Sequence, residues 1–262
     1  MLTKTQIEQR DGKLTASRVA CLMTGNETDI LDLWQEMIGD PAHVPEDLSG
    51  VWPVQLGSCT EGLNLDWFER KHGPLSRRGD VLTHENGWAA CTLDAWSDLH
   101  GCPVECKHVG GREALSTIIE RYQPQMHWQM IVSGAGRCAL SVIEGSNEPV
   151  VEFLDKDEAY ATELMARATA FMQHVWNLTP PVALAPVTAP VKPEKSYDMQ
   201  GNNSWGANAA TWLGTRQAKK DCDASEKELK ALVPADAVKC FGYGIEIRRD
   251  RAGRLSLKEK VS

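Results

Sequence analysis

The stretch CTLDAWSDLHGCPVECKHV, residues 91–109, decides which fold this sequence can adopt. Residues 88–96 and 103–109 are predicted strands, because both are short, apolar and rich in residues that favour extended backbone. Residues 97–101, between them, carry the small and polar side chains of a turn. The stretch therefore predicts two neighbouring strands of one sheet.

Charged side chains lie at corresponding places on these two strands. Asp94 belongs to the first strand, and Glu105 and Lys107 belong to the second. Side chains alternate along a strand, so Glu105 and Lys107 share one face. The opposite face receives Val104, Cys106 and His108.

Hydrophobic periodicity around this stretch predicts an α/β domain with helices packed on a central sheet. Another strand is expected at residues 137–143. The helix predicted at 155–176 has Asp155 as its N-cap and an apolar stripe of Leu164, Ala168, Phe171 and Val175. The other expected helices are residues 15–23, 58–71 and 124–133, the last with its proline in the first turn.

A proline-rich stretch divides the chain. Residues 179–195, TPPVALAPVTAPVKPEK, have the composition of an extended linker. We therefore expect a first domain at residues 1–178 and a small α+β module at residues 196–262. The module is predicted to contain a helix at residues 226–232 and a hairpin whose strands, residues 238–248 and 254–258, flank the turn at 250–253.

Composition excludes several classes of protein. Of the 262 residues, 42% are hydrophobic and 24% charged, which is ordinary for a globular protein and unlike a disordered or fibrous one. No apolar run approaches the roughly 18–20 residues of a membrane helix, and residues 1–13 lack the apolar core of a signal peptide. Eight scattered cysteines predict reduced thiols in a cytoplasm, not a disulfide framework.

Charge is distributed unevenly along the chain. The formal net charge is −8, but residues 1–191 carry 14 Lys and Arg against 26 Asp and Glu, whereas residues 192–262 carry 14 against 10. A negative total does not exclude DNA binding, because only the local field at the contact matters. The positive segment includes Lys219-Lys220 and Arg248-Arg249-Asp250-Arg251. It could contact a phosphate backbone, bind another protein, or form a solvated charged surface.

Asp94, Glu105 and Lys107 suggest metal-dependent chemistry. Two carboxylates on neighbouring strands can hold a hard divalent cation such as Mg²⁺, with an ammonium group beside it. That arrangement suits hydrolysis of a phosphodiester, in which Lys107 positions or deprotonates the attacking water and offsets developing charge. The spacing alone is unspecific, and an exposed hairpin with a Glu–Lys pair is the alternative interpretation.

Four further residues invite a zinc interpretation, which we disfavour. Ligands two residues apart on one strand face lie too far apart to share a zinc ion without a sharp reversal of the chain. The spacings also lack the paired arrangement of zinc-binding motifs, and an iron–sulfur cluster would need four converging cysteines. The residues concerned are His100, Cys102, Cys106 and His108.

Four blocks in order carry a resemblance to a known family. Asp94…Glu105-Cys106-Lys107 resembles the PD-(D/E)xK nuclease motif, with Leu93 where proline would stand. The segments LTASRVACLM (14–23), GSCTEGLNLDWFERKHG (57–73) and YQPQMHWQM (122–130) are similar to the lambda-exonuclease-like viral recombinase family. The resemblance covers roughly residues 10–145 and leaves the C-terminal segment outside.

The resemblance implies a restriction-endonuclease-like core, with a central mixed sheet flanked by helices. It also implies a Mg²⁺-dependent 5′→3′ exonuclease that acts on double-stranded DNA ends in phage recombination, beside a single-strand annealing protein. A ring-shaped homotrimer is the assembly that it implies. The expected metal ligands are Asp94, Glu105 and the main-chain carbonyl of Cys106, and Mn²⁺ is expected to substitute for Mg²⁺.

Glu61 has two interpretations. Ser58-x-x-Glu61 is the pattern of a capping box, in which Glu61 bonds back to the Ser58 amide. The resemblance instead favours Glu61 as a third carboxylate at the metal site, acting directly or through water. In that case Cys59, Leu63 and Trp67 are expected to face the core.

Tyr122, Gln125 and Gln129 share one helical face. Uncharged amides can bond water or phosphate oxygens without adding charge to the site, although the same residues suit an exposed polar face. The resemblance favours Gln125 as the functional residue.

A phosphate pocket is expected at the start of the first domain. An arginine beside a hydroxyl-bearing helix start can bind an anion, although plain N-capping by Thr15 or Ser17 is the alternative. The resemblance assigns the 5′-terminal phosphate to Arg10, Ser17 and Thr92, the last replacing the more usual serine.

The sequence therefore predicts a cytoplasmic deoxyribonuclease of a phage or prophage in a bacterial host. It would resect duplex ends from 5′ to 3′ and leave 3′ single-stranded tails. The residue chemistry supports metal-dependent phosphodiester hydrolysis; polarity and exonuclease character come from the resemblance. The alternatives are a structure-specific endonuclease and a catalytically idle DNA-binding subunit whose role is assembly.

Overall fold

The computed structural model describes residues 3–44, 47–111, 113–190 and 197–260. The chain forms two compact units, residues 1–192 and 193–262.

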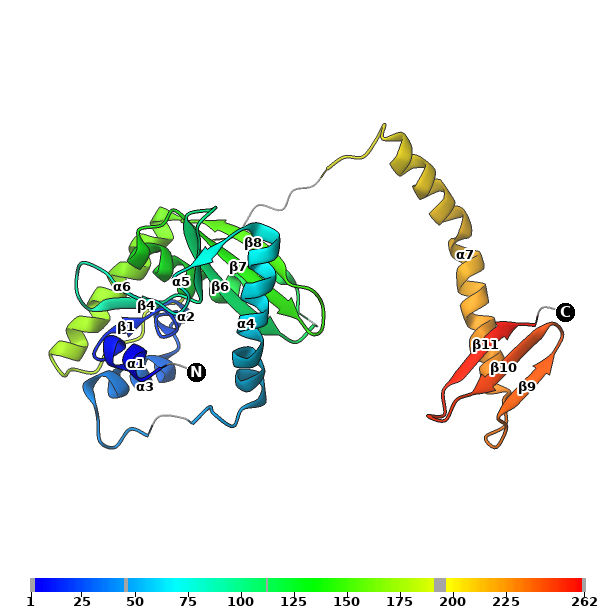
Figure 1. Ribbon diagram of the computed structural model, residues 1–262, viewed down its shortest axis with the longest axis horizontal. Helices are drawn as coiled ribbons and strands as arrows, with labels where there is room; N and C mark the ends of the chain where they lie inside the picture. The colour runs from blue at the N-terminus through cyan, green and yellow to red at the C-terminus, as the bar shows by residue number, and fades with distance from the viewer. Residues whose placement is uncertain (1–2, 45–46, 112, 191–196, 261–262) are drawn as a thin grey trace. The chain divides into compact units, whose positions relative to one another are not determined.

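The first unit is built on a central mixed sheet of five strands in the order β2-β5-β6-β7-β8 (Figure 1). Only β6 and β7 run parallel, and the other neighbours are antiparallel. This arrangement confirms the predicted central mixed sheet. The strands are β2 (Leu75–Ser76), β5 (Ala95–Ser97), β6 (Cys102–Val109), β7 (Arg137–Glu144) and β8 (Val150–Asp155).

Long helices cover the two faces of this sheet. On one face, Leu65 and Phe68 of α4 (Trp52–His72) pack against Val104 and Cys106 of β6. On the other face, α5 (Leu115–Ser133) packs its Ile118, Met126 and Met130 against Leu140 and Val142 of β7. Even-numbered and odd-numbered residues of β6 therefore face different helices, as strand alternation requires.

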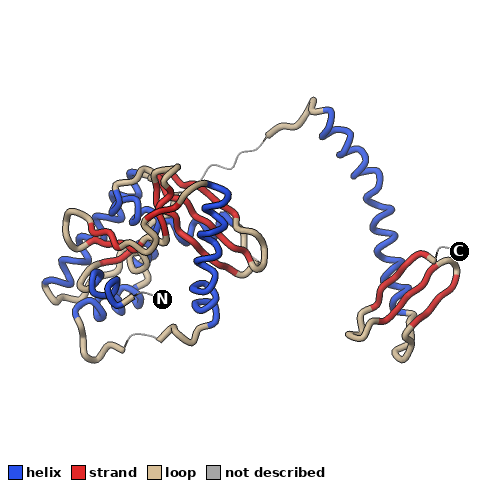
Figure 2. The backbone as a smooth tube through the Cα atoms, in the orientation of Figure 1, coloured by secondary structure: helices blue, strands red, loops and turns tan. Residues whose placement is uncertain are grey.

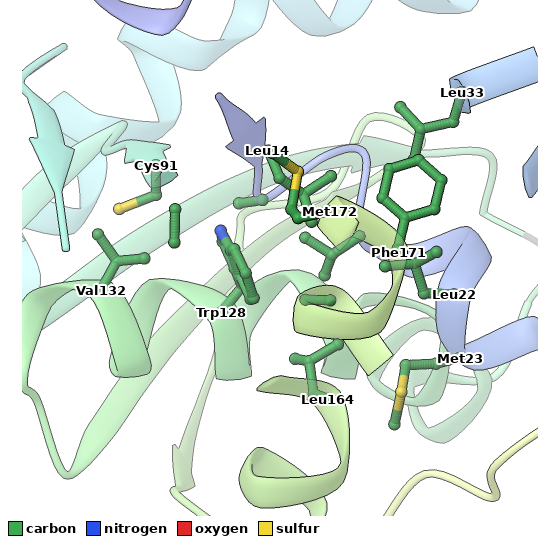
Figure 3. Packing of buried hydrophobic residues seen from close by; sticks show 14 of the residues in the cluster. Leu14, Leu22, Met23, Leu33, Cys91, Trp128, Val132, Leu164, Phe171 and Met172 are labelled. Carbon is green, nitrogen blue, oxygen red and sulfur yellow. The ribbon is translucent and has the colours of Figure 1, made fainter. Parts of the chain in front are cut away.

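A second, three-stranded sheet lies beside the central one. Its order is β1-β4-β3, formed by β1 (Leu14–Thr15), β4 (Ala89–Thr92) and β3 (Val81–Thr83). Its core cluster is shared with α2 (Ala20–Thr24), α3 (Glu27–Ile38) and α6 (Glu158–Trp176). Figure 3 shows Trp128 among Leu14, Leu164 and Met172 of this cluster, and the Trp128 indole N–H donates to the carbonyl of Ala90 at 2.9 Å.

The strand predicted at residues 88–96 is divided into two. β4 ends at Thr92 and belongs to the small sheet, whereas β5 begins at Ala95 and belongs to the central sheet. Between them, Leu93 donates its N–H to Asp80 and accepts from the N–H of Gly79. Asp94 therefore lies where the chain crosses from one sheet to the other.

Two predicted helix starts are wrong. Thr15 lies in β1, paired in parallel with Ala90, and α2 begins only at Ala20 after the N-cap Val19, which makes no side-chain capping bond. β8 extends through Asp155, so Asp157 caps α6 by accepting from the N–H of Tyr160. In both cases strand pairing takes residues that local propensity assigns to a helix.

The helix predicted at residues 124–133 begins nine residues earlier, at Leu115. Pro124 is therefore inside α5 rather than in its first turn, so the Glu120 carbonyl lacks the usual N–H donor four residues on. Buried residues precede and follow the proline, Ile118 and Met126 among them, and their packing offsets that loss. The predicted stripe of α6, by contrast, is buried as expected: Leu164, Ala168, Phe171 and Val175.

The second unit is a helix and a three-stranded antiparallel sheet, β11-β10-β9. The helix predicted at residues 226–232 is the end of α7 (Asn203–Ala231), a 29-residue helix without a buried residue. The predicted strand 238–248 is a hairpin of β9 (Lys239–Gly242) and β10 (Ile245–Arg249). Residues 250–253 turn the chain into β11 (Leu255–Glu259), as predicted (Figure 2).

Part of the proline-rich stretch lies against the first unit. Val187 donates its N–H to the carbonyl of Met23, and Ala183 and Val187 pack on the core cluster. Pro190 accepts from the Gln123 amide at 3.2 Å, and Ala189 is buried. We call residues 179–190 the strap; they cover α2 instead of extending into solvent.

All eight cysteines are free thiols, and they differ in exposure. Cys59 in the first unit and Cys222 in the second are exposed. Burial raises the pKa of Cys21 and Cys91 to about 12 and that of Cys102 to about 11. Among the described residues, no helix is both long enough and apolar enough to cross a membrane.

The contacts of the strap indicate that the first unit extends beyond the end of α6. A chain ending at residue 178 should be less stable than one ending at residue 190 by about 1–3 kcal/mol, because it loses apolar burial and the bond to Met23. Urea unfolding of both truncated chains measures the difference. Equal stability would show that the strap contributes nothing to the first unit.

His127 predicts a loss of stability in acid. The side chain is 1% exposed, its Nδ1 lies 3.0 Å from the Gln123 carbonyl oxygen, and its Nε2 accepts from the Asp157 N–H at 3.1 Å. Burial lowers the pKa of His127 below 6.5. Its stabilising contribution is therefore complete above about pH 6.5 and is lost as the pH falls through the folded pKa. Urea unfolding at pH 7.5 and at pH 5.5 measures this loss. On going from pH 7.5 to pH 5.5, the free energy of unfolding should fall less in His127→Gln than in the wild type. An equal fall in both proteins would contradict the prediction.

Candidate active site

Asp94 is held at the edge of β6. β5 pairs with β6 only from Cys102 to Val104, so the backbone of Cys106 has no strand partner on that side. Instead, the Cys106 N–H donates to Asp94 Oδ2 at 2.8 Å. The N–H and C=O of one strand residue point to the same side, so the Cys106 carbonyl is directed toward the Asp94 edge as well.

Glu105 is a buried carboxylate between β6 and α5. Only 2% of its side chain is exposed. Gln125 Nε2 donates to Oε1 and Gln129 Nε2 donates to Oε2, both at 2.5 Å, and Lys107 forms an ion pair with Oε1. Both oxygens therefore have donors, as a buried charge requires.

Lys107 lies on the same strand face as Glu105. Its ammonium group lies 4.9 Å from the centre of the Tyr122 ring, which adds a cation–π contact. Burial opposes its charged form, but the charges of Glu105 and Asp94 outweigh burial and raise the pKa of Lys107. In this arrangement Lys107 is a protonated donor that can stabilise negative charge.

Glu61 lies inside α4, four residues before Leu65. The helix begins at Trp52 after the N-cap Val51, so Ser58 is in its interior and the capping-box interpretation of Glu61 is wrong. The expected core face is also wrong, because Cys59 is exposed, Leu63 is 63% exposed and Trp67 is only half-buried. The buried face is instead Asn64, Leu65 and Phe68, and Glu61 continues this face toward the site.

A second polar cluster lies around Arg10 at the end of α1 (Lys4–Arg10). Its guanidinium donates to Thr92 Oγ1 at 3.4 Å and to Thr15 Oγ1 at 3.2 Å. Ser17 Oγ lies 3.5 Å from Thr15 Oγ1. Thr15 and Ser17 therefore contribute hydroxyls without capping a helix. In the described parts of the chain Arg10 has no ion-pair partner, and burial and the nearby Arg18 lower its pKa.

Both clusters line one cavity of about 270 Å³. Eight of the predicted site residues line this cavity, together with Gln6 and Thr15, which the sequence did not single out as site residues; Cys106 and Gln129 are not among the lining residues. Gln6 donates to the carbonyl of Gly79 at 2.7 Å and closes the capping box of α1 with Thr3, so it fixes the helix that carries Arg10. The candidate residues in the cavity are Arg10, Ser17, Glu61, Thr92, Asp94, Glu105, Lys107 and Gln125.

The carboxylates of this cavity repel one another. Burial and the charges of Glu105 and Glu61 raise the pKa of Asp94 well above its usual value, against the opposing effects of Lys107 and the Cys106 N–H. A divalent cation would relieve this repulsion, so the donor set fits a hard metal ion. Side chains alone do not complete a site, because no three His, Cys, Asp or Glu residues of the described chain are grouped to hold a metal.

Gln129 contributes more than the sequence indicated. It is fully buried and bonds Glu105 Oε2, and its own Oε1 lies 3.6 Å from Cys138 Sγ. The sequence signal was its position four residues after Gln125, which places two amides on successive turns of one face. The structure thus pairs one amide with each oxygen of Glu105.

The disfavoured zinc site receives no support. His108 Nδ1 lies 3.1 Å from Thr60 Oγ1 and its Nε2 lies 2.9 Å from the Gly145 carbonyl oxygen, so both ring nitrogens have partners. Cys102 and Cys106 are buried in the core cluster under α4. The His100 ring packs against Phe153 at 4.6 Å.

Because the Glu105 carboxylate is buried, we expect the hydrogen bond from Gln129 to stabilise the fold. Gln129→Leu should lower the free energy of unfolding by about 1–3 kcal/mol, because a buried carboxylate loses a donor. Gln123→Leu is the matched control, since buried Gln123 donates to a neutral carbonyl, Pro190, and should cost less. Urea unfolding in EDTA compares them, and an equal loss would contradict a special role for Gln129.

Comparison with known proteins gives one family and one fold. Residues 7–136 match the YqaJ-like viral recombinase domain family. No curated protein sequence matches the chain. The crystal structure of an alkaline exonuclease, LHK-Exo from Laribacter hongkongensis, is similar at 17% identity and a TM-score of 0.55, covering 67% of this chain and 94% of that chain. LHK-Exo in complex with dAMP is similar at 20% identity and a TM-score of 0.56, with the same coverage. At such identities the likeness establishes a shared fold.

Proposed function

Because residues 7–136 form a YqaJ-like viral recombinase domain, and this part of the chain belongs to that family, we propose that the protein is a Mg²⁺-dependent deoxyribonuclease. It acts on double-stranded DNA ends as a 5′→3′ exonuclease and leaves 3′ single-stranded tails. The similar LHK-Exo structure is that of an alkaline exonuclease, which agrees with this activity.

One observation carries the proposal. A single cavity is lined both by the acidic side chains around Glu105 and by the polar cluster around Arg10. This combination suits an exonuclease that binds the 5′-terminal phosphate close to the bond that it cuts. In our proposal, Arg10, Ser17 and Thr92 hold the 5′-phosphate, and Thr15 supports Arg10.

The metal would be held by few protein ligands. Asp94, Glu105 and the Cys106 carbonyl are the proposed ligands, with Glu61 acting through water, and Mn²⁺ is expected to substitute. When bound, Mg²⁺ supplies Lewis-acid polarisation of the phosphodiester and a water of lowered pKa. Mg²⁺ commonly keeps several waters and takes one or two carboxylates, which agrees with this small ligand set.

The side chains supply the remaining chemistry. Lys107, protonated between two carboxylates, donates to the negative charge that develops on the phosphate oxygens. Gln125 touches both Glu105 and the cavity, so its amide can orient water there without changing the charge. Glu105 keeps its orientation because Gln129 holds its second oxygen.

The proposal extends to partners and location. Duplex DNA ends are the substrate, a single-strand annealing protein is a partner, and a homotrimeric ring encloses the DNA. The protein then works in the cytoplasm of a bacterial host that carries the phage or prophage.

End-labelled duplex DNA with Mg²⁺ tests the activity. Release of mononucleotides from 5′ ends supports the proposal. Internal nicks would indicate a structure-specific endonuclease, and retention without cutting would indicate an idle DNA-binding subunit. Either of these outcomes would overturn the exonuclease assignment.

Lys107→Ala should abolish hydrolysis and leave DNA binding largely intact, because it removes the charge-stabilising ammonium but keeps the proposed metal ligands. The loss should be at least about 100-fold, the usual effect of removing one such donor. Lys156→Ala is the control, because Lys156 pairs with Glu158 on another element. Near-normal resection by Lys107→Ala would contradict the assignment of the active site.

The proposed 5′-phosphate site around Arg10 predicts that the rate of resection depends on the chemical group at the 5′ end. Duplex with a 5′-phosphate should be resected faster than duplex with a 5′-hydroxyl, and Arg10→Ala should shrink this difference, because the phosphate loses its cationic partner. Lys13→Ala is the control, because Lys13 is a nearby lysine that does not line the cavity. If the wild-type protein is indifferent to the end group, there is no 5′-phosphate pocket.

A further inference from the structure

The sheet of the second unit has two different faces. Cys240, Ile245 and Ile247 face the end of α7, in an apolar cavity that is also lined by Leu229, Leu232, Val233, Phe241, Gly242 and Tyr243. Strand alternation and the register of β9, β10 and β11 place another set of side chains on the opposite surface. We call this surface the outer face; it consists of Lys239, Phe241, Glu246, Arg248, Ser256, Lys258 and Lys260.

The outer face is cationic. Four of its side chains carry positive charge and only Glu246 carries negative charge. Glu246 pairs with Lys239 at 2.6 Å and with Arg248, which holds these two cations in place. Across the described residues, Lys258 and Lys260 have no ion-pair partner, so their charges remain available to an anion.

An exposed aromatic ring lies among these cations. Phe241 is 69% exposed, and the ammonium groups of Lys239 and Lys260 lie 5.5 and 5.2 Å from its ring centre. Although Phe241 is among the residues that line the apolar cavity at the end of α7, most of its side chain is exposed, so the ring is available to a ligand. Both ammonium groups lie over this ring, so a base that stacks on Phe241 would take their place and bring its phosphates close to them.

A second aromatic side chain follows in the β9–β10 turn. Tyr243 is fully exposed, and its backbone has a φ of +48°, a conformation that favours Gly or Asn over a bulky residue. Because Tyr243 comes two residues after Phe241 at the edge of the same sheet, two rings are available to successive bases.

We propose that the outer face binds single-stranded DNA. Bases stack on Phe241 and Tyr243, and the phosphates contact Lys239, Lys258, Lys260 and Arg248. In a duplex the faces of the bases are stacked on one another and are free only at the two ends. Exposed aromatic rings therefore favour binding of a single strand. The choice of DNA over RNA rests on the proposed function, since resection produces a single DNA strand.

Binding is measured by fluorescence anisotropy with the full chain in EDTA, so that no metal-dependent cleavage occurs. The probe is a fluorescein-labelled 20-nucleotide oligo(dT). Phe241→Leu should weaken binding about 5-fold to 100-fold, because stacking on the ring is lost while an apolar side chain is kept. Lys258→Gln with Lys260→Gln should lower the slope of log affinity against log salt by about 1.4, or 0.7 per lost phosphate contact.

Two variants on α7 are matched controls. Trp212→Leu removes an aromatic ring that is 61% exposed, and Lys219→Gln with Lys220→Gln removes two positive charges. Both should leave the affinity within about twofold of wild type. Equal weakening by these controls would show unspecific attraction and overturn the proposal. Tyr243→Ser, which changes only an exposed turn, serves if Phe241→Leu proves unfolded by circular dichroism.

Other probes separate the remaining outcomes. Tighter binding of a 20-base-pair duplex, unaffected by Phe241→Leu, would overturn the proposal, as would preference for oligo(rU) over oligo(dT). Asp94→Asn, which should abolish cleavage, should bind oligo(dT) as the wild type does. The inference can thus fail while nuclease activity is present, or hold while it is absent.

Discussion

The Glu105 carboxylate lies between a strand and a helix, with 2% of its side chain exposed, and its hydrogen bonds set the requirements for its neighbours. A buried charge without partners would cost several kcal/mol, so each oxygen must find donors. Gln125 and Gln129 provide them from α5, and Lys107 provides another from the same strand. One face of α5 must therefore carry amides where packing alone would favour apolar residues.

The crossing at Leu93 and Asp94 brings the second carboxylate to this place. The chain leaves the small sheet after Thr92 and enters the central sheet at Ala95. Asp94, between them, accepts from the free edge of β6. Since β1 pairs with β4, the same crossing brings Thr15 and Thr92 within reach of Arg10. The crossing between the two sheets thus brings acidic and cationic side chains to a common cavity.

Sequence reasoning succeeded where one local pattern determined the outcome. Alternation in β6 correctly separates Glu105 from Cys106, and the stripe of α6 is buried as expected. It failed where tertiary contacts decided the structure. Thr15 pairs with β4 instead of starting a helix, and Pro124 remains inside α5 because both sides of that helix are packed.

The faces of α4 and α7 show a different reason for failure. Apolar residues of α4 occur on more than one side, so the stripe with Cys59 and Leu63 could not be distinguished from the buried face with Leu65 and Phe68. No residue of α7 is buried, so this long helix has no apolar stripe whose periodicity could be detected in the sequence. The candidate cavity depended less on such patterns, because its charged residues were identified by type and spacing.

The exposure of the thiols has a practical consequence. Six of the eight cysteines are at least partly covered, which leaves one exposed cysteine in each unit, Cys59 on α4 and Cys222 on α7. The thiolate is the nucleophile that attacks an alkylating reagent, and burial keeps the thiols of Cys21, Cys91 and Cys102 protonated at neutral pH. The natural chain thus offers a donor and an acceptor position for fluorescence energy transfer between its two units, without any engineered cysteine.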